Sequence, residues 1–295
     1  MGKFNWKVGE MLQNEYFRRP AYKVKNKIVG SLDNADSCHF TWENNPMLSW
    51  QWLMTPNRMK IYLENLKQNL TTDSAIRNIV KILLRDGILT DSSFKQGVYS
   101  RYETPNDMRM WNYHRKFQFQ FESIDQELDQ TKFANIDNMD DLWASFGGFS
   151  LYAGIKNIEI YAPTNDYCEI TIPNFKCYGA DSYEFSGDNQ YLGHWNKKGL
   201  RTKSADAGIA IFNQNGNNTN DPSFMHTLGY ARFQDAYDVY FCVRNEHYNR
   251  YREKYGKGGE MIVWTQPNII PIKNFIFRIT KGGMITYGFS NFSAT

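Results

Sequence analysis

The spacing of the apolar residues changes along the chain, and this change constrains the fold more than any other feature. Between residues 72 and 86 the apolar side chains recur at intervals of three and four residues, which places them on one face of a helix. They are Ile76, Ile79, Val80, Leu83 and Leu84. Thr72 or Asp73 can cap the start, and Gly87 follows the end. The sequence therefore predicts an amphipathic helix over 72–86.

The chain before this helix contains a second helical stretch and a less regular arm. Apolar residues between 47 and 70 recur at the same spacing, and Pro56 interrupts the pattern. Proline lacks the N–H that a helix interior needs, so we expect the helix over 47–70 to break near Pro56. The first fifty residues show neither periodicity, and we expect them to form an irregular arm.

Alternation replaces the helical spacing from residue 115 onward. In the run 115–122, Phe117, Phe119 and Phe121 alternate with charged or amide residues, which predicts a half-buried strand with the three rings on one face. Later segments give further expectations. Asp137 or Asn138 can cap a short helix that runs through Leu142 to Phe146. Strands are expected over 149–161, 167–177, 207–213, 237–244, 260–265 and 274–280, and a helix over 245–255 capped by Asn245.

This order of elements indicates an α+β fold, in which a helical N-terminal portion is followed by a mainly antiparallel, β-rich C-terminal portion. We place the portions at 1–130 and 131–295. The border near 125–137 is polar but contains neither Pro nor Gly. A single continuous unit is therefore an open alternative to two domains.

Composition excludes several classes of protein. With 41% hydrophobic residues in 295, the chain can bury a sizeable core, yet no apolar run approaches the roughly 20 residues of a membrane-spanning helix. The net charge is only +3 and no long block carries one sign, which does not favour a nucleic-acid partner. The four cysteines form no CxxC pair, so we expect buried thiols in a protein made in reducing cytoplasm without a secretory signal.

The densest polar and aromatic cluster lies between residues 177 and 195. If a strand continues through it, Asp181 and Tyr183 point to one side while Glu184 points to the other. The turn-forming residues 186–189 can fold His194 back towards the strand. A carboxylate beside an imidazole is the minimum equipment for general acid–base catalysis. The alternative is that Tyr183 is a core aromatic residue and His194 a surface imidazole.

A second cluster spans residues 244–260. Arg244, Arg250 and Arg252 precede the glycine-rich loop that contains Lys257. Guanidinium groups and glycine amides can together hold a phosphate group. The alternative is a solvated helix that ends at a capping glycine. His39 beside Cys38 has no further ligand at metal-binding spacing, and we treat that pair as incidental.

Three segments, 140–149, 178–195 and 243–260, resemble in order and spacing an uncharacterised bacterial domain family whose members are commonly encoded beside type VI secretion components or among polymorphic toxins. The pattern DSYxF–G–LGxW is the most specific part of the match. The resemblance implies an antibacterial effector that is made in the producer cytoplasm, carried by a type VI spike or carrier protein, and injected into the envelope of a target cell. It also implies a cognate immunity protein.

The segment Asp181-Ser182-Tyr183-Glu184 also resembles the Asp-x-Tyr-Asp motif of colicin M-type bacteriocins, which cleave the lipid-linked peptidoglycan precursor. Here Glu replaces the second Asp, and Trp195 rather than Arg follows the histidine. The resemblance implies a catalytic set of Asp181, Tyr183, Glu184 and His194. Asp181 and Glu184 would hold a divalent metal such as Mg²⁺ or polarise the attacking water. The cationic residues that would bind the substrate phosphates are Arg244, Arg250, Arg252 and Lys257.

Two other classes of function stay open. The amphipathic stretches 47–70 and 72–86, together with many Trp and Tyr residues, suit a toxin that perturbs membranes without breaking a bond. A secretion-associated adaptor or binding module is the third possibility.

Overall fold

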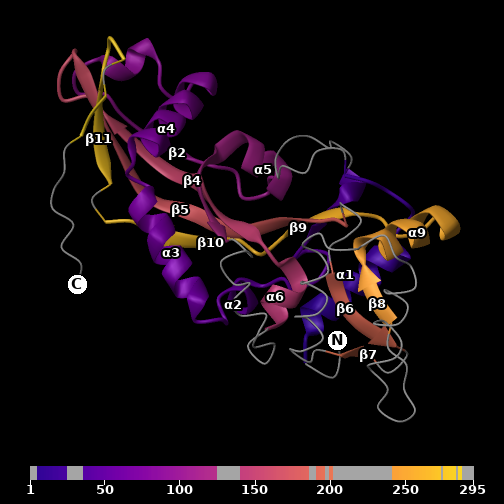
Figure 1. Cartoon of the computed structure of the whole chain (residues 1–295). Coiled ribbons are helices and arrows are strands. Elements are labelled where there is room, and N and C mark those ends of the chain that lie inside the picture. The colour runs from indigo at the N-terminus through magenta and orange to yellow at the C-terminus, as the bar shows by residue number, and fades with distance from the viewer. Residues whose placement is uncertain are drawn as a thin grey trace, which may run out of the picture. The chain divides into compact units, whose positions relative to one another are not determined.

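The computed structural model describes residues 5–24, 36–124, 140–185, 191–196, 199–201, 241–273, 275–283 and 285–287. These residues form an α+β fold, as the sequence predicts (Figure 1). The helices are α1 (Lys7–Arg18), α2 (Trp50–Leu53), α3 (Arg58–Asn69), α4 (Asp73–Arg85), α5 (Met110–Phe117), α6 (Asp141–Phe146) and α9 (Asn245–Tyr255), with short 3-10 turns at Asp36–Cys38 and Asp91–Phe94. Among them, no helix is both long and apolar enough to cross a membrane.

The strands form two sheets. Their bounds are β1 (His39–Thr41), β2 (Tyr99–Glu103), β3 (Gln118–Ile124), β4 (Phe149–Tyr161), β5 (Tyr167–Tyr183), β6 (Tyr191–Asn196), β7 (Gly199–Arg201), β8 (Phe241–Arg244), β9 (Met261–Trp264), β10 (Asn268–Pro271), β11 (Ile276–Thr280) and β12 (Ile285–Tyr287). The larger sheet has the order β1-β9-β5-β11-β12, with β10 also on β5 and with β4 paired to β2, β3 and β5. The smaller sheet has the order β7-β6-β8.

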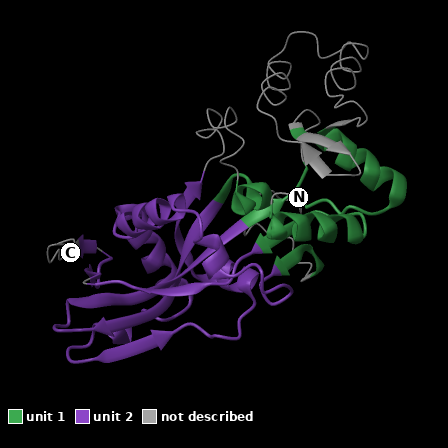
Figure 2. Cartoon of the chain, turned by 90° about the horizontal axis from the view of Figure 1, so that it is seen from below, with its two compact units in different colours: residues 1–40, 125–149, 181–263 green, residues 41–124, 150–180, 264–295 purple. Residues whose placement is uncertain are grey.

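The chain divides into two compact units, each assembled from three stretches (Figure 2). Unit 1 contains residues 1–40, 125–149 and 181–263, and unit 2 contains 41–124, 150–180 and 264–295. The sequence-based border between 1–130 and 131–295 lies in a range outside the described residues, as do the expected strand over 207–213 and the start of the one over 237–244.

The predicted helix over 72–86 is confirmed as α4. Thr72 caps it, since its hydroxyl oxygen accepts the Ala75 N–H at 3.4 Å. Ile76, Ile79, Val80 and Leu83 are buried, whereas Leu84, which was expected on the same face, is 56% exposed. The expected break near Pro56 is also confirmed, because α2 ends at Leu53 and α3 begins at Arg58. Both α3 and α4 contact β3, and they lie beside the long strands of unit 2 (Figure 1).

The expectation of an irregular arm over the first fifty residues is wrong, because this region contains α1. Its buried residues include Val8, Leu12 and Tyr16, four residues apart, so one face enters the core of unit 1. No local side chain caps its start. Instead, the carboxylate of Asp141 accepts the N–H groups of Val8 at 3.0 Å and Gly9 at 2.9 Å. A residue remote in sequence thus supplies the cap.

The expectation of one strand over 115–122 is partly wrong. Residues up to Phe117 belong to α5, and β3 begins at Gln118. The buried face of α5 consists of Met110, Tyr113, His114 and Phe117, a helical spacing that overrides the local alternation. Phe119 is buried on β3, whereas Phe121 is 50% exposed, so the three phenylalanine rings do not share one buried face.

The expected cap of the short helix at Asp137 or Asn138 is wrong, because α6 begins at Asp141 and the Asp140 carboxylate accepts the Trp143 N–H at 2.8 Å. The strand expected over 167–177 is longer than predicted, since β5 continues to Tyr183. The expected helix over 245–255 is α9, although Arg244 rather than Asn245 precedes its first turn. The long strands β4 and β5 pair antiparallel from Ser150 opposite Ala180 to Tyr161 opposite Glu169. Their pairing fixes which residues of unit 2 face each helix.

Gly154 tests how tightly α5 packs on β4. A Cβ at this position would lie 2.6 Å from Tyr113 Oη, and that hydroxyl donates a hydrogen bond to Ile155 O at 2.7 Å. We expect Gly154→Ala to lower the free energy of unfolding by about 1–3 kcal/mol, measured by urea denaturation. Gly282→Ala is the matched control, because its nearest neighbour would be 3.9 Å away. Equal stability of the two variants would contradict the packing described.

Candidate functional site

The candidate catalytic segment lies at the end of β5 and enters unit 1. Tyr183 and Phe185 both contact Tyr16 of α1, with ring centroids 6.2 Å and 4.8 Å apart, and Phe185 stacks on Tyr248 of α9 at 3.8 Å. Burial raises the pKa of Tyr183 well above its usual range. The environment of Tyr183 is therefore that of a core aromatic residue, and its phenol stays protonated.

Asp181 is the titratable group with the most unusual environment in this segment. Burial raises the pKa of its carboxyl well above the usual range, the Glu184 carboxylate raises it further, and the Ser182 backbone amide opposes both. Two carboxyl groups thus lie close enough to interact. Such pairs are the usual source of an acid that keeps its proton and a base that does not.

His194 belongs to the smaller sheet. On β6 it lies opposite Cys242 of β8, and Tyr191 lies opposite Arg244. The His194 side chain and the predicted turn over 186–189 are outside what the structure describes. The role of His194 as a proton shuttle stays a prediction.

The four predicted substrate-binding residues occupy different environments. Arg252 is buried and pairs with buried Glu260, with Nη1 and Oε1 2.7 Å apart. Arg250 is exposed and pairs with Glu246 one turn away at 3.1 Å. Lys257 is exposed, while Arg244 is buried at the start of α9. The structure therefore does not gather them at one place on the surface.

The glycine-rich loop after α9 binds the end of α1. Gly258 N–H donates to Arg19 O at 3.0 Å and Gly259 N–H donates to Tyr16 O at 3.1 Å, while Gly256 N–H closes α9 on Arg252 O. Gly256 and Gly258 have φ of +63° and +94°, values that favour glycine. These amides donate hydrogen bonds to the C-terminal ends of two helices. The loop therefore matches the alternative in which a glycine ends the helix, rather than a phosphate-binding loop.

Glu260 is a central residue of unit 1 that the sequence analysis missed. Besides Arg252, its carboxylate accepts the Val24 N–H at 2.9 Å, and its own N–H donates to Tyr22 O at 3.0 Å. Arg252 also contacts Asn249 and lowers the pKa of Tyr16, which burial nevertheless raises to about 12. Val24 and Glu260 are far apart in sequence, so no local spacing could have indicated this network.

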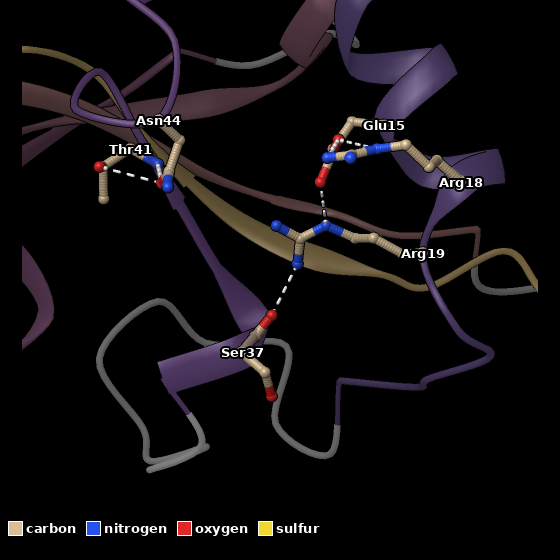
Figure 3. Close-up of polar contacts among 6 residues, drawn as sticks. All are labelled: Glu15, Arg18, Arg19, Ser37, Thr41 and Asn44. Carbon is tan, nitrogen blue, oxygen red and sulfur yellow. Dashed lines mark hydrogen bonds and ion pairs between the residues drawn. The ribbon is translucent and has the colours of Figure 1, made fainter.

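Charged contacts also fix the chain after α1. Glu15 accepts hydrogen bonds from both Arg18 and Arg19, and Arg19 Nη1 reaches Ser37 O at 2.7 Å (Figure 3). Ser37 belongs to the short turn that leads into β1. The same figure shows the Asn44 side chain accepting the Thr41 N–H at 2.9 Å, a local turn contact.

The described residues contain no group of three or more His, Cys, Asp or Glu side chains arranged to hold a metal ion. Cys38 and His39 are both buried beside the Ser37 turn. Cys38, Cys168 and Cys177 are buried, as expected, and burial raises the pKa of Cys168 to about 11. The metal-binding role of Asp181 and Glu184 stays a prediction.

The buried pair of Arg252 and Glu260 gives a stability prediction. Glu260→Gln leaves the Arg252 guanidinium buried without its counter-charge, and we expect the free energy of unfolding to fall by about 3–5 kcal/mol in urea denaturation. Glu246→Gln removes the partner of exposed Arg250 and is the matched control, with an expected change below about 1 kcal/mol. Similar losses in both variants would show that burial of the pair is not what matters.

Asp181 gives a prediction of pH dependence. Its raised pKa means that the folded protein binds more protons than the unfolded chain above about pH 4, so this carboxyl makes stability fall as pH rises. Asp181→Asn is neutral at every pH. Its stability relative to the unchanged protein should therefore increase from pH 4 towards the folded-state pKa and then level off. Urea denaturation between pH 4 and pH 8 measures the difference.

The matched control for this pH series is Glu253→Gln, which changes an exposed carboxylate on α9. We expect its stability relative to the unchanged protein to show no such trend. If the stability of Asp181→Asn relative to the unchanged protein also did not change with pH, Asp181 would not be desolvated.

Comparison with known proteins identifies the family of the chain. Residues 1–278 match the model of a family of unknown function, DUF6402, and the chain belongs to that family. No curated protein and no solved structure matches the chain.

Proposed function

We propose that this DUF6402 protein is an antibacterial effector, delivered by type VI secretion, that hydrolyses a bond in the target cell envelope with Asp181 as its acid. The observation that carries the hydrolytic part is the half-buried Asp181 at the end of β5, where desolvation raises the pKa of its carboxyl well above the usual range beside Glu184. A carboxyl group with a raised pKa keeps its proton to higher pH and can donate it to a departing oxygen. The delivery route rests on the resemblance of segments 140–149, 178–195 and 243–260 to secretion-associated domains.

The proposed substrate is the lipid-linked peptidoglycan precursor, as in the colicin M-type bacteriocins that the Asp181–Glu184 motif resembles. Water adds across the bond between the prenyl chain and the pyrophosphate. Glu184 accepts a proton from the attacking water, and Asp181 gives its proton to the departing oxygen. His194 would return the proton from Glu184 to Asp181 after each cycle.

The cationic residues divide between two roles in this proposal. Arg250 and Lys257 are exposed and can meet an anionic headgroup, although Arg250 must exchange its contact with Glu246. Arg252 is neutralised by Glu260 inside unit 1, and we assign it to positioning α9. A divalent metal such as Mg²⁺ would add electrostatic stabilisation if Asp181 and Glu184 bind one, but no step above depends on it.

The proposal includes the partners that such an effector needs. It would be made in the producer cytoplasm, bound there by a cognate immunity protein and loaded on a spike or carrier protein. The membrane-perturbing alternative would need the apolar face of α4, which is buried in unit 2. We therefore favour bond cleavage over membrane disruption, and an adaptor role is the outcome if no toxicity is found.

Periplasmic expression in a sensitive bacterium tests the proposal. We expect lysis with loss of the lipid-linked precursor, measured by extraction and mass spectrometry. Asp181→Asn should abolish both effects, because the departing oxygen then has no acid. Glu253→Gln should kill as the unchanged protein does.

Three other results would each reject a part of this assignment. Killing by a folded Asp181→Asn variant removes Asp181 from catalysis. Rapid depolarisation with unchanged precursor favours the membrane-perturbing class. Unimpaired growth with soluble protein in the periplasm favours the adaptor class.

A further inference from the structure

Two buried lysines lie on the paired strands of unit 2. Lys156 on β4 is 4% exposed and Lys176 on β5 is 8% exposed. Lys176 lies opposite Gly154 in the strand register, two positions before Lys156. Placing two ammonium groups in one interior region is costly unless each charge is compensated or one proton is lost.

Lys156 has a full set of partners. Its Nζ lies 2.5 Å from Glu103 Oε1 and 2.7 Å from Asn106 Oδ1. The hydrogen bond and the charge of Lys156 lower the pKa of Glu103. One carboxylate, that of Glu103, therefore compensates the charge of Lys156.

The positive charge of Lys176 is compensated far less than that of Lys156. Its Nζ lies 4.4 Å from the centroid of the Tyr113 ring, and among the residues that the structure describes no carboxylate forms an ion pair with it. Burial and then the charge of Lys156 lower its pKa, while Glu103 acts in the opposite direction. The face of the Tyr113 ring also favours the ammonium form, but it supplies no counter-charge.

The surroundings of Lys176 hold it in one position. Tyr113 from α5 covers it and is itself anchored by the hydrogen bond to Ile155 O at 2.7 Å. The absence of a side chain at Gly154 leaves room for this ring, since a Cβ there would lie 2.6 Å from Tyr113 Oη. A lysine that is desolvated and placed beside a second cation is the arrangement that yields a nucleophilic amine at neutral pH.

We propose that Lys176 is a reactive amine that condenses with small aldehydes or ketones. The neutral nitrogen attacks the carbonyl carbon and forms a carbinolamine, which loses water to give an imine. No oxidant or reductant takes part in this step. Because Lys176 is only 8% exposed and its Nζ lies 4.4 Å from the Tyr113 ring centroid, we specify a small carbonyl compound. The residues involved are separate from Asp181 and Glu184, so this proposal and the proposed function fail independently.

Competitive reductive methylation tests the proposal on the full chain. The protein is treated at pH 7 with limiting formaldehyde and cyanoborohydride, which reduces the imine to a stable methylamine, and each lysine is then quantified by peptide mass spectrometry. We expect Lys176 to react several-fold faster than exposed Lys81 and Lys254, because each unit of lowered pKa gives about ten times more free amine. A rate equal to or below that of the exposed lysines overturns the proposal.

Two variants identify the cause of the reactivity. Lys156→Met removes the neighbouring charge and should slow the labelling of Lys176 relative to the unchanged protein, with burial of Lys176 as the remaining cause of its lowered pKa. Lys156→Arg keeps the charge and should preserve the original rate. Circular dichroism confirms that both variants are folded. If Lys176 in Lys156→Met reacts as fast as in the unchanged protein, the paired-lysine mechanism is wrong. In the unchanged protein, the rate at Lys176 should also level off at a lower pH than the rate at Lys81.

Discussion

The organisation of unit 1 depends on the buried ion pair between Arg252 and Glu260. An arginine in the interior needs a carboxylate at hydrogen-bond distance, and only Glu260 provides one within the described residues. Glu260 in turn binds the backbone at Val24 and Tyr22, so the segment after α1 is fixed to the segment after α9. The glycine amides of the loop after α9 then donate hydrogen bonds to carbonyl groups at the end of α1. One electrostatic requirement thus determines the course of three segments.

This constraint explains why the most suggestive cationic motif has a mainly structural role. Residues 244–260 contain arginines, two lysines and glycines in an order that suits phosphate binding. Arg252 is buried in its ion pair with Glu260 and is not available to a phosphate. The glycine amides donate to the C-terminal carbonyls of α1 and α9, which would otherwise lack partners. Arg250 on α9 and Lys257 in the loop after it are exposed to solvent.

In unit 2, too, buried charges need compensation, but only one of two buried lysines is paired with a carboxylate. The register of β4 and β5 brings Lys156 and Lys176 into one buried region, and Glu103 compensates one of them. The second lysine meets an aromatic ring instead of a carboxylate. Desolvation therefore lowers the pKa of Lys176, just as it raises that of Asp181 in unit 1. In both places an incompletely compensated buried charge marks the group with unusual chemistry.

By itself, the sequence determined the elements whose stability is local. The spacing of Ile76, Ile79 and Leu83 and the cap at Thr72 specify α4, and the expected strand over 149–161 agrees with β4. The tertiary structure alone decided the start of α1, where Asp141 caps the helix, and the end of α5, where burial of Phe117 overrides alternation. It also decided the environments of Asp181, Arg252 and Lys176. The physical reason is that desolvation and charge compensation depend on neighbours brought together from distant parts of the chain, which no short-range pattern records.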